Sequence, residues 1–512
     1  MSVEQENTAG GDAIVAEEPT VEVRFVTRLG AEYRVPDMPF RVPVRLTRHG
    51  LSEIVNHLLG REYEDEDEKK EEEEEGEEGM KDGEKEKEKK KEGRLRPVPF
   101  DILVQGEFLR TSLRKHLATR GVAVGEGVVT LEYTLALSQP DARPPFGYGD
   151  WVAALSTVVL PGGRDVCAAG GYACTLKLYD ASAPGGAGPV GVVERAHAGV
   201  AVKCLCTLGV DSAARLRERG VAALASGGKD ALVRAWTLAE AGPAGRTAVR
   251  ASCAAVFRGH GDAVEALDSS PDGSRLCSGS WDRTIRIWDT GFICDGVTAQ
   301  PPDSKRSRGG NGDGDKDDKD DKEKEDGKKA GAGAAAGEEK EAVAVLEGHT
   351  SVVNVVRWPT HMQLISGGND CALRLWDVLK GTNVSTIRAT RAVNTLDYST
   401  ENGLCASAHP DGVVRLWDPR TSHGTIEAKT IRAHKGWVSA VAWHPAQSTV
   451  LLSASYDGTL KIWDLRAGAA MHVARNVNGG KVLCARWWQH PAGPVEIVSG
   501  GVDGFISRRL MP

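Results

Sequence analysis

The order of apolar and polar positions in the first part of the chain predicts a small domain of mixed strands and helices. Residues 21–27, VEVRFVT, alternate as in a half-buried strand, whereas Leu51, Val55 and Leu58 recur at helical spacing. The expected elements are strands at 21–27 and 32–43, a helix at 46–60, a strand and turn at 99–110, a short helix at 111–121 and a strand at 127–137. These elements predict an α+β domain at residues 21–137.

A second pattern recurs along the rest of the chain. Residues 276–289, 364–377, 404–418 and 451–464 each run from an apolar, Ser-containing segment to a Trp-Asp ending, and residues 224–236 match without the final Asp. Once a charged insertion is subtracted, the ending returns about every forty residues, which is the period of a WD-type propeller blade with four strands.

Three weaker units complete the count of repeats. Residues 151–180 lack the Ser and the Asp of the pattern, residues 382–418 lack its upstream His, and residues 470–510 lack its Trp. The prediction is a mainly β fold, with a seven-bladed WD-type propeller at residues 151–512 behind the α+β domain. The pattern leaves open which N-terminal segment closes the last blade.

Four repeats contain the same four polar residues, and their recurrence indicates a structural role. In a WD blade the His of a turn can bond the Asp of another turn and a Ser, and this Ser in turn reaches the Trp indole. Four copies of a catalytic triad make little chemical sense, whereas four copies of a structural network do. The sets are His197, Ser226, Asp230 and Trp236; His260, Ser278, Asp282 and Trp288; His349, Ser366, Asp370 and Trp376; and His434, Ser453, Asp457 and Trp463.

Composition limits the remaining classes. The chain has 512 residues, a net charge of −8 and 40% apolar residues, so it can bury sizeable cores but shows no overall attraction to nucleic acid. No apolar run approaches the length of a membrane span, and no membrane partner is expected. The ten cysteines lack zinc-site spacing. We therefore expect no catalytic residue, no cofactor and no metal held by this chain alone.

Several stretches are predicted to lie outside the folded domains. The charged residues 62–94 and 295–341 contain too little apolar surface to offset chain entropy, and both are predicted to be disordered insertions. The acidic residues 1–20 are predicted to be disordered, and residues 138–150 to form a linker. The basic patches KEKEKKK and SKRSR fit solvated extensions, with nuclear targeting signals or interaction tails as the alternative.

Four segments carry a more specific resemblance: VEVRFVTRLG, LTRHGLSEIVNHLL, PFDILVQGEFLRTSLRKHL and LEYTLAL. The element order is that of a ubiquitin-like β-grasp, and the segments resemble the Notchless-like N-terminal domain of the Ytm family of WD-repeat ribosome biogenesis factors. The resemblance covers residues 21–137 apart from the insertion. A Notchless-type paralogue is the alternative, but Notchless carries eight blades, so the count of seven favours the Ytm family.

The resemblance implies a non-enzymatic assembly factor that is needed for maturation of large-subunit rRNA in the nucleus, nucleolus and nucleoplasm. Its propeller would bind a block-of-proliferation-type WD protein, in a complex with a Pescadillo-type protein, inside the large-subunit pre-ribosomal particle. The AAA ATPase midasin would then grip the ubiquitin-like domain and remove the factor.

The resemblance also implies a role for Glu126. The family's glutamate at this place reaches an Mg²⁺ ion held by midasin's adhesion site, and Mg²⁺ takes oxygen ligands at about 2.0–2.1 Å. Gly125 and Gly127 suit a protruding turn. The segment GVAVGE is one residue longer than the family's pattern. Without the family, Glu126 is an ordinary solvated turn residue.

Three alternatives come from other classes of function. A substrate receptor of a ubiquitin ligase could also combine a propeller with a small domain, but no ligase-docking helix is visible in the sequence. A hydrolase would need a nucleophile elbow or a phosphate loop, and neither spacing occurs. A direct RNA binder would need a basic face lined with aromatic residues, which the short C-terminal SRRL does not supply; contact with rRNA inside the particle stays open.

Overall fold

The computed structural model describes residues 19–61, 97–120, 127–137, 139–183, 187–208, 221–241, 248–295, 338–420, 427–467, 469–490 and 493–511. The chain divides into two units, one made of residues 1–138 with residues 466–468 and the other of residues 139–465 and 469–512. No helix in these described ranges is long and apolar enough to cross a membrane.

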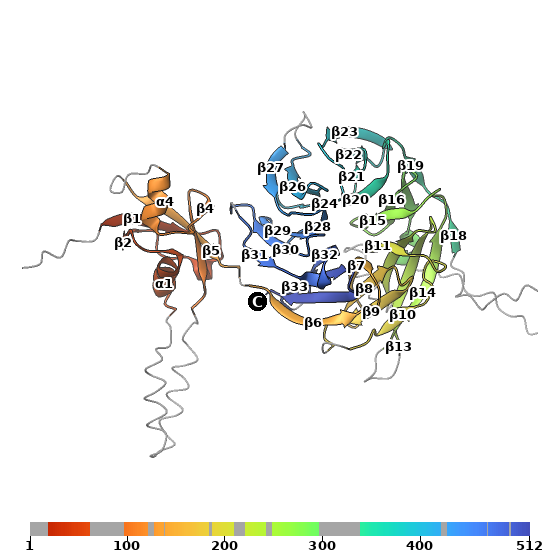
Figure 1. Cartoon of the computed structure of the whole chain (residues 1–512), viewed down its shortest axis with the longest axis horizontal. Coiled ribbons are helices and arrows are strands. Elements are labelled where there is room, and N and C mark those ends of the chain that lie inside the picture. Colours follow the sequence, from red (N-terminus) through yellow and green to blue (C-terminus); the bar gives the residue numbers. More distant parts are fainter. Residues whose placement is uncertain are drawn as a thin grey trace, which may run out of the picture. The chain divides into compact units, whose positions relative to one another are not determined.

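The described residues of the N-terminal unit form a five-stranded sheet with two helices (Figure 1). The strands lie in the order β2-β1-β5-β3-β4, and β1 runs parallel to β5. This arrangement confirms the predicted α+β class. The elements are β1 (Thr20–Val26), a 3₁₀ turn (Ala31–Tyr33), β2 (Pro39–Pro43), α1 (Arg48–Leu58), β3 (Phe100–Val104), β4 (Glu107–Phe108), α4 (Leu113–Thr119) and β5 (Val129–Leu135).

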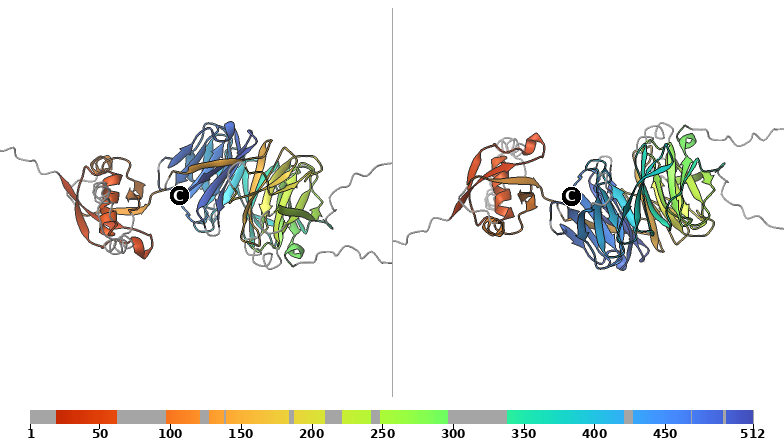
Figure 2. Two further views of the ribbon diagram at one scale, coloured as in Figure 1. Left: turned by 90° about the horizontal axis from the view of Figure 1, so that it is seen from below. Right: turned by 90° about the horizontal axis from the view of Figure 1, so that it is seen from above.

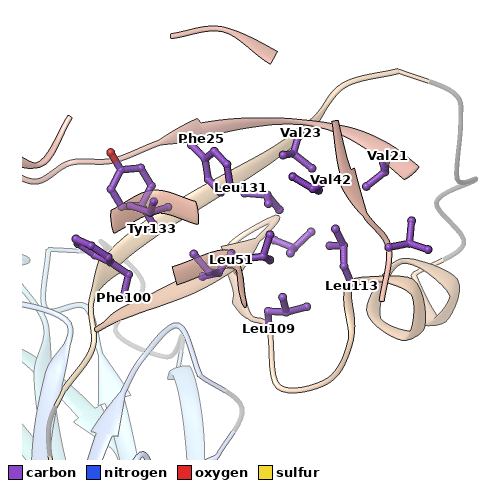
Figure 3. Close-up of a cluster of buried hydrophobic side chains, with 14 of the residues drawn as sticks. Val21, Val23, Phe25, Val42, Leu51, Phe100, Leu109, Leu113, Leu131 and Tyr133 are labelled. Atoms are coloured by element: carbon purple, nitrogen blue, oxygen red, sulfur yellow. The ribbon is translucent and has the colours of Figure 1, made fainter. Parts of the chain in front are cut away.

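The core of this unit follows from the period of each element. Alternation along β1 buries Val21, Val23 and Phe25, and helical spacing along α1 buries Leu51 (Figure 3). Tyr133 of β5 packs edge-on against the Phe100 ring at 5.5 Å. Its hydroxyl donates to the Tyr33 carbonyl at 2.6 Å, so the one polar atom of the ring is satisfied.

The described residues of the second unit form seven sheets around a ring (Figures 1 and 2). Each sheet contains one blade of four antiparallel strands, numbered 1 to 7 along the chain, with the first strand of the blade innermost. Inner strands of neighbouring blades pack together, and β32 of blade 7 packs on β7 of blade 1, so the ring is closed. The seven-bladed propeller predicted from the repeats is confirmed.

Blade 1 contains β7 (Val152–Val159), β8 (Asp165–Gly171), β9 (Leu176–Asp180) and β10 (Gly191–Val193), and blade 2 contains β11 (Val202–Thr207), β12 (Ala222–Gly228), β13 (Val233–Ala241) and β14 (Ala248–Phe257). Blade 3 contains β15 (Val264–Ser269), β16 (Arg275–Ser280), β17 (Ile285–Asp289) and β19 (Ala344–Leu346), and blade 4 contains β20 (Val353–Thr360), β21 (Gln363–Gly368), β22 (Ala372–Asp377) and β23 (Thr382–Arg388). Blade 5 contains β24 (Thr395–Tyr398), β25 (Cys405–Ala408), β26 (Val413–Trp417) and β27 (Glu427–Arg432), and blade 6 contains β28 (Val438–Trp443), β29 (Val450–Ser455), β30 (Leu460–Asp464) and β31 (His472–Ala474). Blade 7 contains β32 (Val482–Gln489), β33 (Val495–Gly501), β34 (Phe505–Leu510) and β6 (Asp141–Gly147). Two short helices, α6 (Gly291–Asp295) and the 3₁₀ turn η3 (Val477–Gly479), lie between strands.

Blades approach each other through glycines on their second strands. A Cβ added at Gly279 of blade 3 would lie 2.7 Å from the Val353 Cγ1 of blade 4. A Cβ at Gly500 of blade 7 would lie 2.5 Å from Val152 of blade 1, so the closing interface is as tight as the others. The missing side chain is what lets the next inner strand pack closely.

The predicted linker at 138–150 is wrong, because β6 lies within it. This strand pairs antiparallel with β34 and supplies the outermost strand of blade 7, which answers how the ring is closed. Phe146 is fully buried and stacks on Tyr179 at 5.0 Å. Pro144 and Pro145 are tolerated because an edge strand need not donate on its outer side.

The boundaries of two predicted disordered segments also change. The insertion expected at 295–341 is too long, since Glu338–Lys340 forms β18 and pairs parallel with β14 at the outer edge of blade 2. There Glu339 accepts a hydrogen bond from Arg258 at 2.8 Å, and a charged strand suits this exposed edge. Thr20 already belongs to β1. Residues 1–18, 62–96 and 296–337 lie outside the described residues.

Candidate functional site

The residues of the four predicted polar networks are hydrogen-bonded to one another, and blade 3 illustrates which atoms donate and which accept. Trp288 Nε1 donates to Ser278 Oγ at 2.8 Å, and Ser278 Oγ lies 2.6 Å from His260 Nε2. His260 Nδ1 lies 2.7 Å from Asp282 Oδ2. An indole can only donate, so Ser278 accepts from Trp288 and donates to Nε2, which leaves the Nδ1 proton for the carboxylate. The Ser278 hydroxyl therefore serves two rings, and Trp288 Nε1 and both His260 nitrogens are hydrogen-bonded.

Blades 2, 4 and 6 repeat this geometry. The distances from Ser Oγ to His Nε2 are 2.8 Å for Ser226 and His197, 2.7 Å for Ser366 and His349, and 2.8 Å for Ser453 and His434. Trp236, Trp376 and Trp463 donate to the same serines at 2.8, 2.8 and 2.9 Å. The His Nδ1 atoms lie 2.8, 2.8 and 3.2 Å from Asp230, Asp370 and Asp457.

Burial and charge set the protonation of these networks. Burial lowers the pKa of His434 to about 4 and also lowers the pKa of His197. Burial disfavours the ionised form of Asp230, but hydrogen bonds and charge from His197 and Arg234 outweigh it and bring the Asp230 pKa to about 2. The resulting state in blades 2 and 6 is a neutral imidazole bonded to a carboxylate. Because the four serines are fully buried, their hydroxyls face other side chains and join different strands. We call each such hydrogen-bonded network of Trp, Ser, His and Asp a clasp.

Blade 5 has a clasp that sequence reasoning missed. The unit at 382–418 was expected to lack a His, but His409 Nε2 lies 2.8 Å from Ser407 Oγ, which also accepts from Trp417 at 2.6 Å. His409 Nδ1 lies 2.8 Å from the Ala392 carbonyl in place of an Asp. The signal was present in the segment SAHPDG, where the His stands two residues after the Ser instead of upstream.

Blade 7 replaces the His by an amide. Asn478 Oδ1 accepts from Ser499 Oγ at 2.9 Å, and Asn478 Nδ2 donates to the Phe505 carbonyl at 2.8 Å. Asn478 has a φ of +53°, a conformation that Asn adopts more readily than most residues. Blade 1 has no such network at its Ala169 and Ala173 positions; there Tyr179 takes the Trp position, and its hydroxyl donates to Gly147 at 2.7 Å.

The inner strands enclose a central channel of about 1350 Å³. Arg357 lies 3.1 Å from Asp397 within it, and Lys203 lies 3.1 Å from Glu265 nearer to one mouth. Cys204 and Cys206 are buried in the wall of the channel. Burial raises the pKa of Cys206 to about 12, so this thiol is protonated at neutral pH. No group of His, Cys, Asp or Glu in the described ranges could hold a metal ion.

Glu126, predicted to reach a partner's metal, lies outside the described residues together with residues 121–125. The flanks are defined. Helix α4 ends at Thr119, and Gly127 has a φ of +93° just before β5, a strand in the middle of the sheet. A Cβ at Gly127 would meet no atom within 4 Å, so the backbone is open on that side. The structure thus fixes both ends of the segment that carries the predicted ligand.

Comparison with known proteins matches both units. The WD domain, G-beta repeat, family matches residues 251–289, 340–377, 381–418 and 426–464, and the NLE (NUC135) domain family matches residues 21–74. A ribosome biogenesis protein WDR12 homolog of Chlamydomonas reinhardtii is 32% identical over 451 residues, which cover 84% of each chain. The chain belongs to the WDR12 family of ribosome biogenesis proteins. Homologs of the same name from Dictyostelium discoideum and Arabidopsis thaliana are 29% and 28% identical and cover 84% and 85% of this chain.

Membership of the WDR12 family gives the chain a role in ribosome biogenesis and an association with pre-ribosomes. It agrees with the resemblance seen in the N-terminal segments. The relatives extend across both units and are covered over 81% to 84% of their own lengths in the three proteins named above. The two units are therefore a shared layout of the family.

Proposed function

We propose that the protein is a non-enzymatic scaffold for assembly of the large ribosomal subunit and supports maturation of its rRNA. It acts within a complex with a Pescadillo-type and a block-of-proliferation-type protein, in the nucleolus and nucleoplasm of the nucleus. The observation that carries this proposal is the WDR12 family relationship, which spans the N-terminal unit and the propeller together. The buried clasps support it, because the recurrent His, Ser and Asp residues are used up in holding blades.

Removal of the factor is proposed to depend on Glu126. The AAA ATPase midasin holds an Mg²⁺ ion through its own groups, and the Glu126 carboxylate fills a remaining position. A hard cation such as Mg²⁺ takes carboxylate oxygens and demands near-octahedral geometry, so the position of the incoming oxygen matters closely. The left-handed φ of Gly127 supports a sharp change of chain direction next to this glutamate.

The test is capture of the full-length protein by the midasin adhesion domain in buffer with Mg²⁺. Glu126→Ala and Glu126→Gln should abolish capture, and Glu126→Asp, shorter by one methylene, should weaken it. Glu32→Ala provides a matched control, since Glu32 is an exposed carboxylate of the same unit. Addition of EDTA should release the wild-type protein. Equal capture of all Glu126 variants would rule out the metal contact.

The assembly role has its own test. Affinity purification of the wild-type protein from nuclear extract should return the Pescadillo-type and block-of-proliferation-type proteins with large-subunit precursors, and Glu126→Ala should retain them. Recovery of a cullin without precursors would support a ubiquitin-ligase receptor instead.

A further inference from the structure

The tryptophans of this protein are divided between two very different environments. Nine of the twelve are buried, whereas Trp151, Trp281 and Trp437 are 47%, 50% and 56% exposed. These three indoles come from blades 1, 3 and 6, which are far apart in sequence. Because an exposed indole is costly in water, their common location needs a reason.

The repeat places all three on one face of the propeller. Trp281 immediately precedes Asp282, the clasp residue of its turn, and Tyr456 holds the same place before Asp457. Tyr172 takes the equivalent place in blade 1. Trp151 and Trp437 each precede the first residue of an inner strand, β7 and β28. We call Trp151, Tyr172, Trp281, Trp437 and Tyr456 the aromatic arc.

Ring contacts pair the members of the arc within blades 1 and 6, and a lysine of blade 2 connects blade 1 with blade 3. Trp151 packs on Tyr172 at 5.4 Å, and Trp437 stacks on Tyr456 at 5.9 Å with an angle of 18°. Lys203 lies 5.6 Å from the Tyr172 ring and 3.1 Å from Glu265, which accepts from Trp281 Nε1 at 2.9 Å. Trp281, Trp437 and Tyr456 also line the central channel, so the arc borders its mouth. The blade 1 and blade 3 members are therefore linked through Lys203 and Glu265, and the blade 6 pair lines the same channel.

The charged side chains around the arc differ in whether they form ion pairs. Glu265 is neutralised by Lys203, whereas Asp150 and Asp262 each accept one backbone N–H at 2.7 Å, from Trp151 and Ala263, and keep their charge. The exposed lysines of the same face, Lys229, Lys435 and Lys481, have no carboxylate within ion-pair distance among the residues that the structure describes. Lys481 instead lies 5.7 Å from the Tyr456 ring.

We infer that the aromatic arc is a docking surface for an extended protein segment that combines acidic residues with aromatic or large aliphatic side chains. Clustered exposed Trp and Tyr residues are the usual energetic centres of protein interfaces, and the unpaired lysines complement acidic neighbours of the inserted side chains. An RNA strand fits less well. It brings one negative charge per nucleotide, and three carboxylates stand among these lysines. The inference goes beyond the proposed function and does not involve Glu126.

The test is selection of random 12-residue peptides displayed on phage against the immobilised full-length protein. We expect enriched peptides to carry Asp or Glu beside Trp, Phe or Leu. Trp437→Ser and Trp281→Ser should each weaken binding of the selected synthetic peptides about tenfold or more. Leu379→Ser is the matched control, because Leu379 is 69% exposed and lies outside the arc, and it should leave binding unchanged.

Unaltered unfolding temperatures should accompany the serine variants, since the replaced rings lie on the surface. A 20-nucleotide oligo(U) strand forms the second arm of the experiment. Tight oligo(U) binding that the Trp variants abolish would overturn the inference in favour of a nucleic-acid surface. Absence of enrichment, enrichment of basic peptides, or peptide binding insensitive to both Trp variants would also overturn it.

Discussion

A single hydroxyl in each clasp joins two rings that belong to different strands or turns. Ser278 Oγ accepts from Trp288 and donates to His260, and the imidazole passes the network on to Asp282. The serine is thus the branching atom of the network, and its loss leaves two buried nitrogens without partners. An unsatisfied buried polar group costs far more than an average hydrogen bond contributes.

Ser278→Ala should lower the free energy of unfolding of the propeller by about 2–4 kcal/mol, because both His260 Nε2 and Trp288 Nε1 lose their partner. Denaturant titration of the full-length protein measures this change. Ser252→Ala, at an exposed position of β14, should change it by less than about 0.5 kcal/mol. Equal effects of the two substitutions would contradict the branching role.

The clasps also predict a pH dependence. The folded protein holds the pKa of His434 at about 4, whereas an unfolded histidine titrates near 6.5. Between these values the unfolded chain binds the proton first, so stability is present above about pH 6.5 and is lost as the pH falls toward 4. At pH 5 this histidine alone should cost about 2 kcal/mol relative to neutral pH.

His434→Gln removes the titrating group and should flatten the fall in stability between pH 6.5 and 4, at the expense of lower stability at pH 7. Chemical denaturation of both proteins at several pH values measures the two slopes. Identical slopes would show that the imidazole titrates normally in the fold. The carboxylate of Asp457, whose pKa is about 2, adds its own loss only at more acidic pH.

At the scale of elements, β6 is the piece on which the closed ring depends. It precedes blade 1 in the chain but completes blade 7, where its partner β34 ends at Leu510. Phe146 is buried between Tyr179, whose ring lies 5.0 Å away, and Arg508, whose guanidinium lies 4.6 Å from the ring. Arg508 in turn pairs with the buried Glu496 at 3.0 Å.

Phe146→Ala should lower the free energy of unfolding of the propeller by about 3–5 kcal/mol, because it leaves a cavity at the closing strand. Val192→Ala on β10, where the side chain is 44% exposed, is the control and should cost less than about 1 kcal/mol. Thermal unfolding monitored by circular dichroism distinguishes the two. A small effect at Phe146 would mean that β6 contributes little to closure.

Sequence patterns predicted what is local and repeated. Period-two and helical spacing indicated the strands and helix of the first unit, and the Trp-Asp endings indicated seven blades and four clasps. They could not indicate β6, because its partner strand is distant in the sequence: Asp141 pairs with Leu510, more than 350 residues away. The prolines of β6 are also more typical of a linker than of a strand. Asn478 and His409 were missed for a related reason, since the acceptor of the Ser hydroxyl can be another residue type or can come from another turn. The role proposed for Glu126 would depend on an ion held by another protein, which no pattern in this chain encodes.

At the scale of the whole molecule, two units with separate cores are joined in one chain. The core of the first unit is built from Val23, Leu51, Phe100 and Tyr133, and none of these side chains belongs to a propeller cluster. The units should therefore unfold independently, each with its own transition.

Leu51→Ala should lower the stability of the first unit by about 2–5 kcal/mol and leave the propeller transition in place. Differential scanning calorimetry of the full-length protein should resolve the shift of one transition only. Phe146→Ala should shift the other transition only. Movement of both transitions by either substitution would show that the units are thermodynamically coupled.

The path of the chain through β6 has a mechanical consequence. The first unit connects to the propeller directly through the strand that latches blade 7, and β6 is bound there mainly by its ladder with β34 and by the buried Phe146. Tension applied to the first unit must therefore act on the pairing of β6 with β34 before it acts on any other blade. A motor that pulls on this unit would strain the pairing of β6 with β34. The force that separates these two strands therefore sets an upper limit on the force that an intact propeller can transmit to its binding partner.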